Sequence, residues 1–144
     1  MSIGLWVRGA RPKTLATSIA SVMVGATMAY AHIEQSGTCI AIYPEPASCA
    51  TAREQQTLLM DRFWPVTILC LLVALFLQIA VNYANDYSDG IRGTDAGRDT
   101  DESKSGKPQR LTASGLVPAK HVLFAAMICA AIACICGRSE ERRV

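Results

Sequence analysis

The sequence predicts an all-α fold, in which about three transmembrane helices pack as a multi-pass bundle. Hydrophobic residues make up 51% of the 144 residues, charged residues only 18%, and the mean hydropathy is +0.24. These values are unusual for a soluble domain of this size. Three apolar stretches also have the length of about 20 residues that crosses a hydrocarbon core of about 30 Å. The predicted spans are residues 14–32, 63–84 and 117–137.

The first span has small and hydroxylated residues among its apolar side chains, namely Ser18, Ser21, Gly25 and Thr27. Such residues are typical of transmembrane helices whose backbones approach closely. A cleaved secretory signal peptide is the alternative, because basic residues precede the stretch and Ala29-Tyr30-Ala31 resembles a cleavage site. The apolar region is longer than the roughly 7–15 residues usual in a signal, which favours the membrane span.

The second span is the most apolar of the three. Residues 66–81 carry no charge, and a helix there would be apolar on every face as far as Gln78. The third span is also strongly apolar and ends where the charged tail 138–144 begins. Both stretches therefore need lipid or other helices around them.

The distribution of Lys and Arg predicts the orientation. Three of these residues precede the first span, two lie between the first and second spans, six lie from residue 85 to residue 120, and three follow the third span. Short loops rich in Lys and Arg are usually cytoplasmic. The N-terminus and the Asp-rich connection 85–116 are therefore predicted to be cytoplasmic. The connection 33–62 is predicted to be an irregular or partly helical excursion outside, whereas the charges of the tail 138–144 oppose the rule.

The cysteines say less about function. Cys39 and Cys49 share the outer connection, where an oxidising compartment would allow a disulfide that their spacing alone does not establish. The other four lie in apolar spans, where a thiol usually behaves as a small hydrophobe; they are Cys70, Cys129, Cys134 and Cys136.

Polar side chains form one stripe along the end of the second span. At 3.6 residues per turn, the stripe contains Gln78, Asn82, either Asn85 or Asp86, and Asp89. An Asp at membrane depth costs about 2.5–3.5 kcal/mol, so the stripe must face a bundle interior or a wet cavity. Gln78 is explained by a hydrogen bond to a neighbouring helix. For the two aspartates, a functional site is the favoured interpretation, and exposure to water beyond the membrane is the alternative.

Two carboxylates on adjacent helical turns converge on one hard cation. Mg²⁺ takes one or two protein carboxylates and fills its other positions with water and phosphate oxygens, so a phosphorylated or diphosphorylated substrate is predicted. A calcium loop of the EF-hand type is excluded, because no register of the acidic run has both the required Gly and the final Glu. Lys107 and Arg110 follow the cluster and are predicted to neutralise a departing diphosphate, whereas Lys104 and Lys120 are explained by the positive charge of a cytoplasmic loop.

These residues carry a resemblance to a known family. The run Asn82-x-x-Asn85-Asp86-x-x-Asp89, followed by Gly93-x-Asp95, resembles the first Asp-rich motif of the UbiA superfamily of intramembrane prenyltransferases. Segments 11–15 and 109–117 resemble the opening of these enzymes and the approach to their third helix. Within the superfamily, the likeness is greatest to the 1,4-dihydroxy-2-naphthoate polyprenyltransferases of menaquinone biosynthesis.

The resemblance implies transfer of a polyprenyl group from polyprenyl diphosphate to an aromatic acid, here 1,4-dihydroxy-2-naphthoate, with decarboxylation to demethylmenaquinone. It implies Mg²⁺ as cofactor, the bacterial cytoplasmic membrane as location, membrane lipid as environment and no nucleic acid partner. The implied metal ligands are Asp86, Asp89 and Asp95. Asn82 and Asn85 would position the carboxylates or contact diphosphate oxygens, and Arg11 and Lys13 would meet the aromatic acid or the diphosphate.

The chain also departs from the family pattern. The family's enzymes resemble bundles of about nine helices and carry a second Asp-rich motif, which this sequence does not contain. We therefore expect residues 1–137 to be the N-terminal part of such a domain, the tail 138–144 to mark a truncation or frameshift, and the chain alone to be inactive without a missing C-terminal half.

Two alternatives belong to other classes of protein. A CDP-alcohol phosphotransferase requires Asp-Gly-x-x-Ala-Arg, which the run from Asp89 to Thr94 does not provide. The remaining alternative is a non-enzymatic small membrane protein or transporter fragment, which would bind a cation through Asp86 and Asp89.

Overall fold

The computed structural model describes residues 3–36, 46–92, 111–112 and 117–141, and almost all of them are helical. The helices are α1 (Ile3–Gly9), α2 (Pro12–Ser36), α3 (Pro46–Arg92) and α5 (Ala119–Glu141). The described part of the chain contains no strand. The predicted all-α class is therefore confirmed, and α1 is an element that the sequence pattern did not predict.

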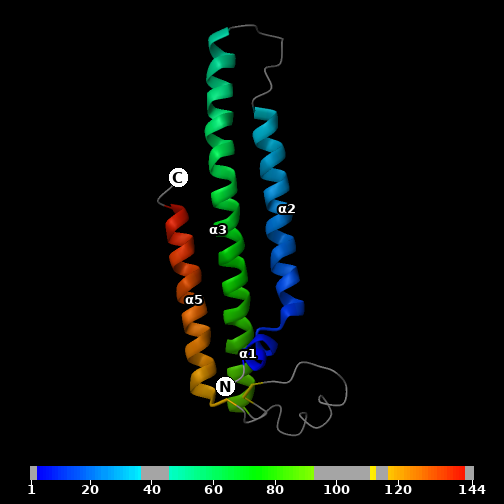
Figure 1. The fold of residues 1–144 in the computed structure, drawn as a ribbon, viewed down its shortest axis with the longest axis vertical. Helices are drawn as coiled ribbons and strands as arrows, with labels where there is room; N and C mark the ends of the chain where they lie inside the picture. The colour runs from blue at the N-terminus through cyan, green and yellow to red at the C-terminus, as the bar shows by residue number, and fades with distance from the viewer. Residues whose placement is uncertain (1–2, 37–45, 93–110, 113–116, 142–144) are drawn as a thin grey trace.

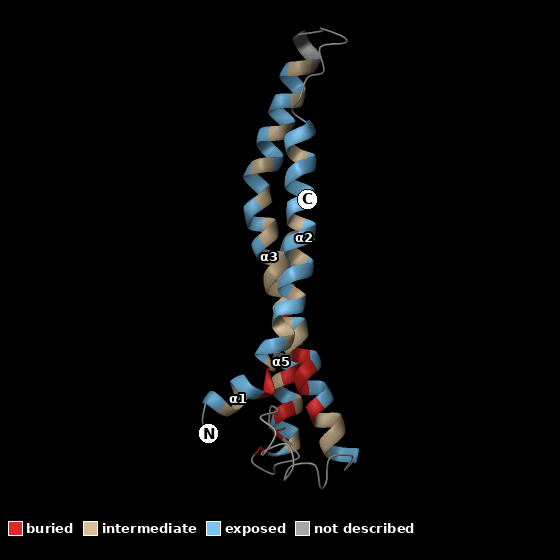
Figure 2. Cartoon of the chain, turned by 90° about the vertical axis from the view of Figure 1, so that its right-hand side faces the viewer, coloured by how far each residue is buried: buried red, intermediate tan, exposed pale blue. Residues whose placement is uncertain are grey.

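The long helix α3 lies between α2 and α5 and runs antiparallel to both (Figure 1). The short helix α1 projects sideways from the same end of the molecule at which α3 finishes and α5 begins (Figures 1 and 2). Four helix segments, from three parts of the chain that are distant in sequence, therefore meet at this end: the end of α1 with the start of α2, the end of α3, and the start of α5.

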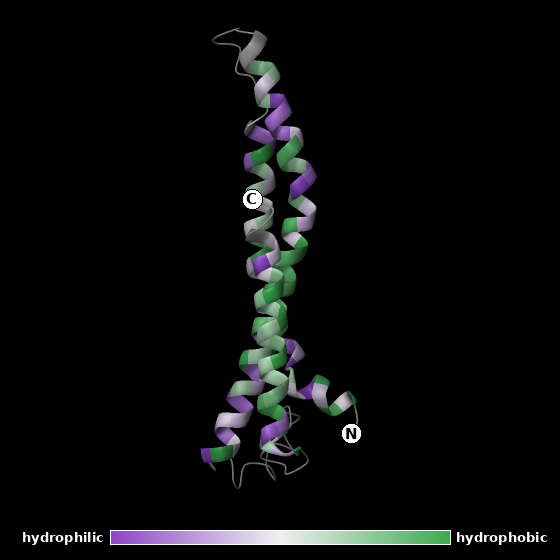
Figure 3. Cartoon of the chain, turned by 90° about the vertical axis from the view of Figure 1, so that its left-hand side faces the viewer, coloured by the Kyte–Doolittle hydropathy of each residue, from purple (hydrophilic) through white to green (hydrophobic). Residues whose placement is uncertain are grey.

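Within the described residues, three helices are long and apolar enough to cross a membrane, by length and composition: Pro12–Ser36, Cys49–Arg92 and Ala119–Ser139. Apolar residues fill the middle of the bundle, and polar residues gather toward its ends (Figure 3). The three spans predicted from the sequence are confirmed as helices in their expected order.

The helix α3 is longer than the span that the sequence predicted. Its 47 residues, at about 1.5 Å each, extend about 70 Å, more than twice a hydrocarbon core of about 30 Å. Residues 46–62, expected to be irregular or partly helical, belong to its first part, where good helix formers such as Ala, Glu, Gln and Leu predominate. The helix passes through Pro65 and continues to Arg92, so the Asp-rich connection begins as helix.

Burial is concentrated at the end where the four segments meet (Figure 2). The core there consists of Ala10, Tyr83, Leu111, Val117, Val122 and Ala126. Farther along, large apolar side chains remain exposed, such as Met28 at 70% and Ile135 at 66%. The rest of the bundle is therefore little buried by its own chain. The end where the four segments meet, called the junction below, is packed.

Four cysteines of the spans are present as thiols and not as disulfides, namely Cys70, Cys129, Cys134 and Cys136. Cys49 is disulfide-bonded. Cys39, which the sequence paired with it as an open alternative, lies outside the described residues.

Candidate functional site

The polar stripe of α3 ends in the packed junction. Asn82 is 4% exposed and Asp86 is 2% exposed, whereas Asn85 lies on the exposed side of the helix. Asp89 is half-buried one turn beyond Asp86. Of the two candidates that helical spacing left open, Asp86 is therefore the one that faces inward.

Asn82 connects α3 to the start of the chain. Its amide nitrogen donates to the carbonyl oxygen of Ala10 at 2.8 Å and to Thr14 Oγ1 at 2.9 Å. Gln78 donates to Asn82 Oδ1 at 3.4 Å within α3, so this bond is not the one to a neighbouring helix that was expected of Gln78. An Asn amide has two hydrogens, so both are used within the protein. The substrate contact predicted for Asn82 stays a prediction, and its observed contacts hold the α1–α2 corner against α3.

The α1–α2 corner is sharp because Arg11 has a φ of 52°, in the left-handed region that residues other than Gly rarely adopt. Pro12 opens α2, where its fixed φ suits the first helical position. The hydroxyl and the amide of Thr14 both donate to the Arg11 carbonyl oxygen, each at 2.9 Å. Because Asn82 bonds to Ala10 and Thr14 on either side of this turn, Arg11 and the exposed Lys13 lie at the same end of α3 as Asp86.

Asp86 connects α3 to the segment that follows the Asp-rich connection. Its Oδ2 accepts the backbone N–H of Leu111 at 2.9 Å, and its backbone carbonyl oxygen accepts the hydroxyl of Thr112. Leu111 is fully buried, with 0% exposure. A buried carboxylate needs donors of this kind, because an uncompensated charge in an apolar setting is strongly unfavourable.

Tyr83 fixes α1 from the same turn of α3. Its hydroxyl donates to the carbonyl oxygen of Trp6 at 3.0 Å, and the two rings meet edge to face with centroids 5.6 Å apart. Sequence reasoning missed Tyr83 as well as Leu111 and Thr112. The enrichment of Trp and Tyr at membrane interfaces was a usable signal for the first. The other two lie in segment 109–117, whose resemblance to the family marked the segment without indicating a contact with Asp86.

The predicted metal set is only partly described. Asp86 and Asp89 lie one turn apart on α3, whereas Asp95, Lys107 and Arg110 lie outside the described residues. Within the described ranges, no three His, Cys, Asp or Glu side chains are grouped closely enough to hold a metal ion. Two carboxylates are nevertheless the number that Mg²⁺ takes when phosphate oxygens and water complete its shell, so the donor chemistry of Asp86 and Asp89 fits this ion.

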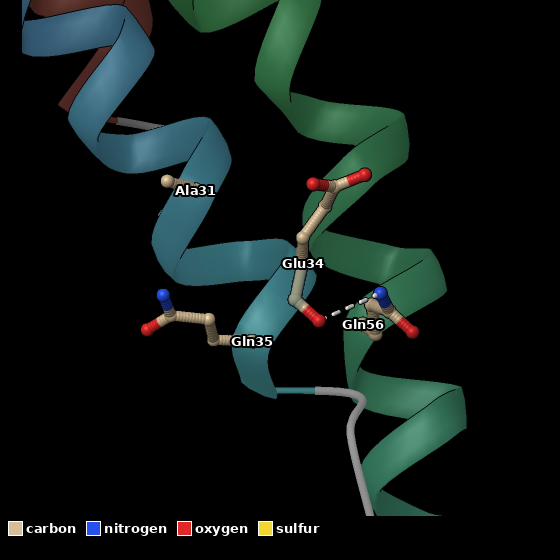
Figure 4. Close-up of a pocket in the computed structure, with 4 residues that line it drawn as sticks. All are labelled: Ala31, Glu34, Gln35 and Gln56. Atoms are coloured by element: carbon tan, nitrogen blue, oxygen red, sulfur yellow. Dashed lines mark hydrogen bonds between the residues drawn. The ribbon is translucent and has the colours of Figure 1, made fainter.

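A shallow open pocket lies at the opposite end of the bundle and is lined by Ala31, Glu34, Gln35 and Gln56 (Figure 4). Gln56 donates to the Glu34 carbonyl oxygen at 3.4 Å across α2 and α3. Its lining contains one carboxylate and no cationic side chain. This pocket therefore does not match the diphosphate chemistry predicted from the sequence.

Comparisons with curated proteins confirm the resemblance. The chain is 34% identical to a 1,4-dihydroxy-2-naphthoate octaprenyltransferase of Mycobacterium leprae and 38% identical to one of Mycobacterium tuberculosis, over 94% of this chain in both cases. It is 29% identical to the protein of that name from Haemophilus influenzae, over 82% of the chain. The chain spans only about a third of the length of these relatives, 35%, 35% and 28% respectively. No family model and no solved structure matches it.

Proposed function

Because its relatives are 1,4-dihydroxy-2-naphthoate octaprenyltransferases, matched over about a third of their length, we propose that this chain supplies the first acidic site of a membrane prenyltransferase. The reaction is transfer of a polyprenyl group from polyprenyl diphosphate to 1,4-dihydroxy-2-naphthoate. The allylic carbon–oxygen bond breaks and diphosphate leaves. A carbon–carbon bond then forms at the ring carbon, which loses its carboxylate as carbon dioxide. The product enters menaquinone biosynthesis.

The carboxylates of Asp86 and Asp89 hold Mg²⁺ in this proposal, together with Asp95. When bound, Mg²⁺ neutralises the charge of the diphosphate as it leaves. Arg11 and Lys13 bring positive charge to the same end of α3 and bind the diphosphate or the acidic acceptor. Asn82 keeps them there, because it holds the corner on which both residues lie.

One observation supports this function above all others: an inward-facing Asp86, 2% exposed, lies at the end of an apolar helix, one turn beyond the Asn82 that holds the α1–α2 corner. A buried carboxylate within a membrane helix is a functional feature by default, since apolar side chains would serve packing alone at lower cost. The identity to proteins named 1,4-dihydroxy-2-naphthoate octaprenyltransferase supports prenyl transfer as the function of this carboxylate.

The test is Mg²⁺-dependent binding of inorganic diphosphate to the full chain in detergent micelles, measured by calorimetry. We expect the double variant Asp86→Asn, Asp89→Asn to lose binding by at least about tenfold, the equivalent of about 1.4 kcal/mol. The matched control is Asp61→Asn, which removes an exposed carboxylate from the distant part of α3 and leaves binding unchanged. Unchanged affinity in the double variant would show that the site is assigned wrongly.

A non-enzymatic cation-binding membrane protein is the second candidate. It is favoured if Mg²⁺ binds through Asp86 and Asp89 equally well with and without diphosphate. The prediction that this chain alone is inactive is tested separately, with purified chain, Mg²⁺, polyprenyl diphosphate and dihydroxynaphthoate; formation of prenylated product would contradict it.

A further inference from the structure

The two ends of the Asp-rich connection are fastened to each other through Asp86. The side-chain Oδ2 of Asp86 accepts the Leu111 N–H, and the Asp86 backbone carbonyl oxygen accepts the Thr112 hydroxyl. The donors lie 25 and 26 residues farther along the chain. One residue of α3 therefore receives two hydrogen bonds from two consecutive residues, which fixes both the position and the direction of the returning chain. We call these three residues, Asp86, Leu111 and Thr112, the clasp.

Two glycines allow the clasp to close. A Cβ on Gly9 would lie 2.4 Å from Leu111 Cδ1, and a Cβ on Gly90 would lie 2.5 Å from Thr112 Cβ. Real Cβ atoms do not approach other heavy atoms this closely, so Leu111 and Thr112 fit only because these positions lack side chains. Leu111 thus packs between the end of α1 and α3, and Thr112 packs on the last turns of α3.

We infer that Leu111 and Thr112 are positioning residues of the acidic site: the Leu111 N–H fixes the Asp86 carboxylate, and Thr112 keeps Leu111 in place, so that Asp86 and Asp89 present their oxygens to one Mg²⁺–diphosphate group. The inference rests on the proposed function. An Asp side chain otherwise turns among its staggered rotamers, and a bond to the backbone N–H of fully buried Leu111 holds Asp86 in one of them. Charge-assisted bonds of this type are also the stronger ones.

The same contacts would be expected of a clasp that only stabilises the fold. The two roles differ in one measurable respect. A structural clasp changes the free energy of unfolding and leaves the diphosphate affinity of the folded protein unchanged. A positioning clasp changes that affinity under conditions in which every variant is folded.

Thr112→Val is the informative variant, because it removes the hydroxyl donor and keeps the branched shape of the side chain. Thr112→Ser keeps the hydroxyl and is the rescue variant. Gly90→Ala opens the clasp from the other side by displacing Thr112 without altering any polar group. The matched control is Thr27→Val, whose exposed hydroxyl bonds only to the Val24 carbonyl oxygen within α2.

Two quantities are measured on the full chain in micelles, below the unfolding midpoint of each variant: the hydrogen-exchange rate of the Leu111 amide and the Mg²⁺-dependent affinity for inorganic diphosphate. We expect Thr112→Val and Gly90→Ala to exchange faster at Leu111 and to bind diphosphate about tenfold more weakly, while the Thr112→Ser and Thr27→Val variants match the original chain.

Faster exchange at Leu111 with unchanged affinity would overturn the positioning role and leave the proposed function standing. Unchanged exchange in both clasp variants would overturn the clasp itself. If the original chain binds no diphosphate, both the proposed function and the positioning role are wrong. The Leu111 exchange rates then show separately whether the clasp itself forms.

Discussion

The two ends of α3 differ in how their side chains are packed and hydrogen-bonded. At the end near Asp86, buried polar groups are matched to donors and acceptors on other segments, and glycines permit contacts that no other residue allows. At the end near Gln56, side chains are mostly exposed, and the contacts to α2 include a long hydrogen bond to the Glu34 carbonyl oxygen and an edge-to-face contact between Tyr30 and Phe63.

The difference follows from what each end contains. A helix in lipid needs only apolar side chains, because its backbone hydrogen bonds are satisfied internally. A carboxamide and a carboxylate in the same helix need specific partners, and those partners come from residues 10, 14 and 111. Tight packing in this molecule therefore marks the end that carries the proposed chemistry.

The largest difference in unfolding free energy is expected between two glycine-to-valine variants, one at Gly9 in the packed end and one at Gly25 on α2. Gly9→Val places a branched side chain where Leu111 Cδ1 already lies, and overpacking of this severity costs about 3 kcal/mol. Gly25→Val enters open space on α2, with nothing within 4 Å, so we expect a change within about 0.5 kcal/mol. The free energy of unfolding is measured by detergent titration of the full chain. Equal losses for the two variants would mean that the junction is not tightly packed.

The next effect concerns the polar partners of α3. Asn82→Leu leaves the buried Ala10 carbonyl without its side-chain donor, which costs about 2 kcal/mol in unfolding free energy. Gln55→Leu, an exposed change on the other half of α3, is expected to stay within about 0.5 kcal/mol. Hydrogen exchange at residues 10–14 should rise in the first variant only. If both variants exchange alike there, Asn82 does not hold the corner.

Much of this contrast was accessible from the sequence. Apolar length located three spans, and helical spacing placed Asn82 and Asp89 on one face with either Asn85 or Asp86 between them. The ends of α3 were not predicted, because the helix extends beyond the apolar span on both sides. No Gly lies between Pro46 and Asp89 to end the helix, and the helix continues through Pro65. Periodicity describes one helix at a time, so it predicted the polar face without its partners.

The contacts of the junction were not predictable in this way. The partners of Asn82 lie 72 and 68 residues away, and the donor to Asp86 lies 25 residues away. The left-handed φ of Arg11 has no sequence signal, because the residue at this position is not a Gly. These features arise from tertiary packing, which no local pattern encodes. The roles of Asp95, Lys107 and Arg110 stay predictions, because these residues lie outside the described part of the chain.

A smaller difference in unfolding free energy is expected between variants of two tyrosines, Tyr83 at the junction and Tyr30 near the other end of the bundle. Tyr83→Phe removes the hydrogen bond to the Trp6 carbonyl oxygen and keeps the ring contact, so a loss of about 1 kcal/mol in unfolding free energy is expected. Tyr30→Phe removes an exposed hydroxyl near the other end and keeps its ring contact with Phe63, so it is expected to be neutral. A neutral Tyr83→Phe variant would indicate that α1 is held by the rings alone.

The smallest effect comes from two glutamines that make bonds of equal length at opposite ends of α3. Gln78 donates to Asn82 Oδ1 at 3.4 Å in the half-buried stripe, and Gln56 donates to the Glu34 carbonyl oxygen at 3.4 Å at the exposed end. Water can replace Gln56 at the last turn of α2, whereas Asn82 is buried and loses a donor if Gln78 is removed. We therefore expect Gln78→Ala to cost about 0.5 kcal/mol and Gln56→Ala to be neutral within error, because Ala also favours the helix. Unfolding titrations of both variants in one detergent make the comparison direct, and a larger loss for Gln56→Ala would reverse the assignment of the two ends.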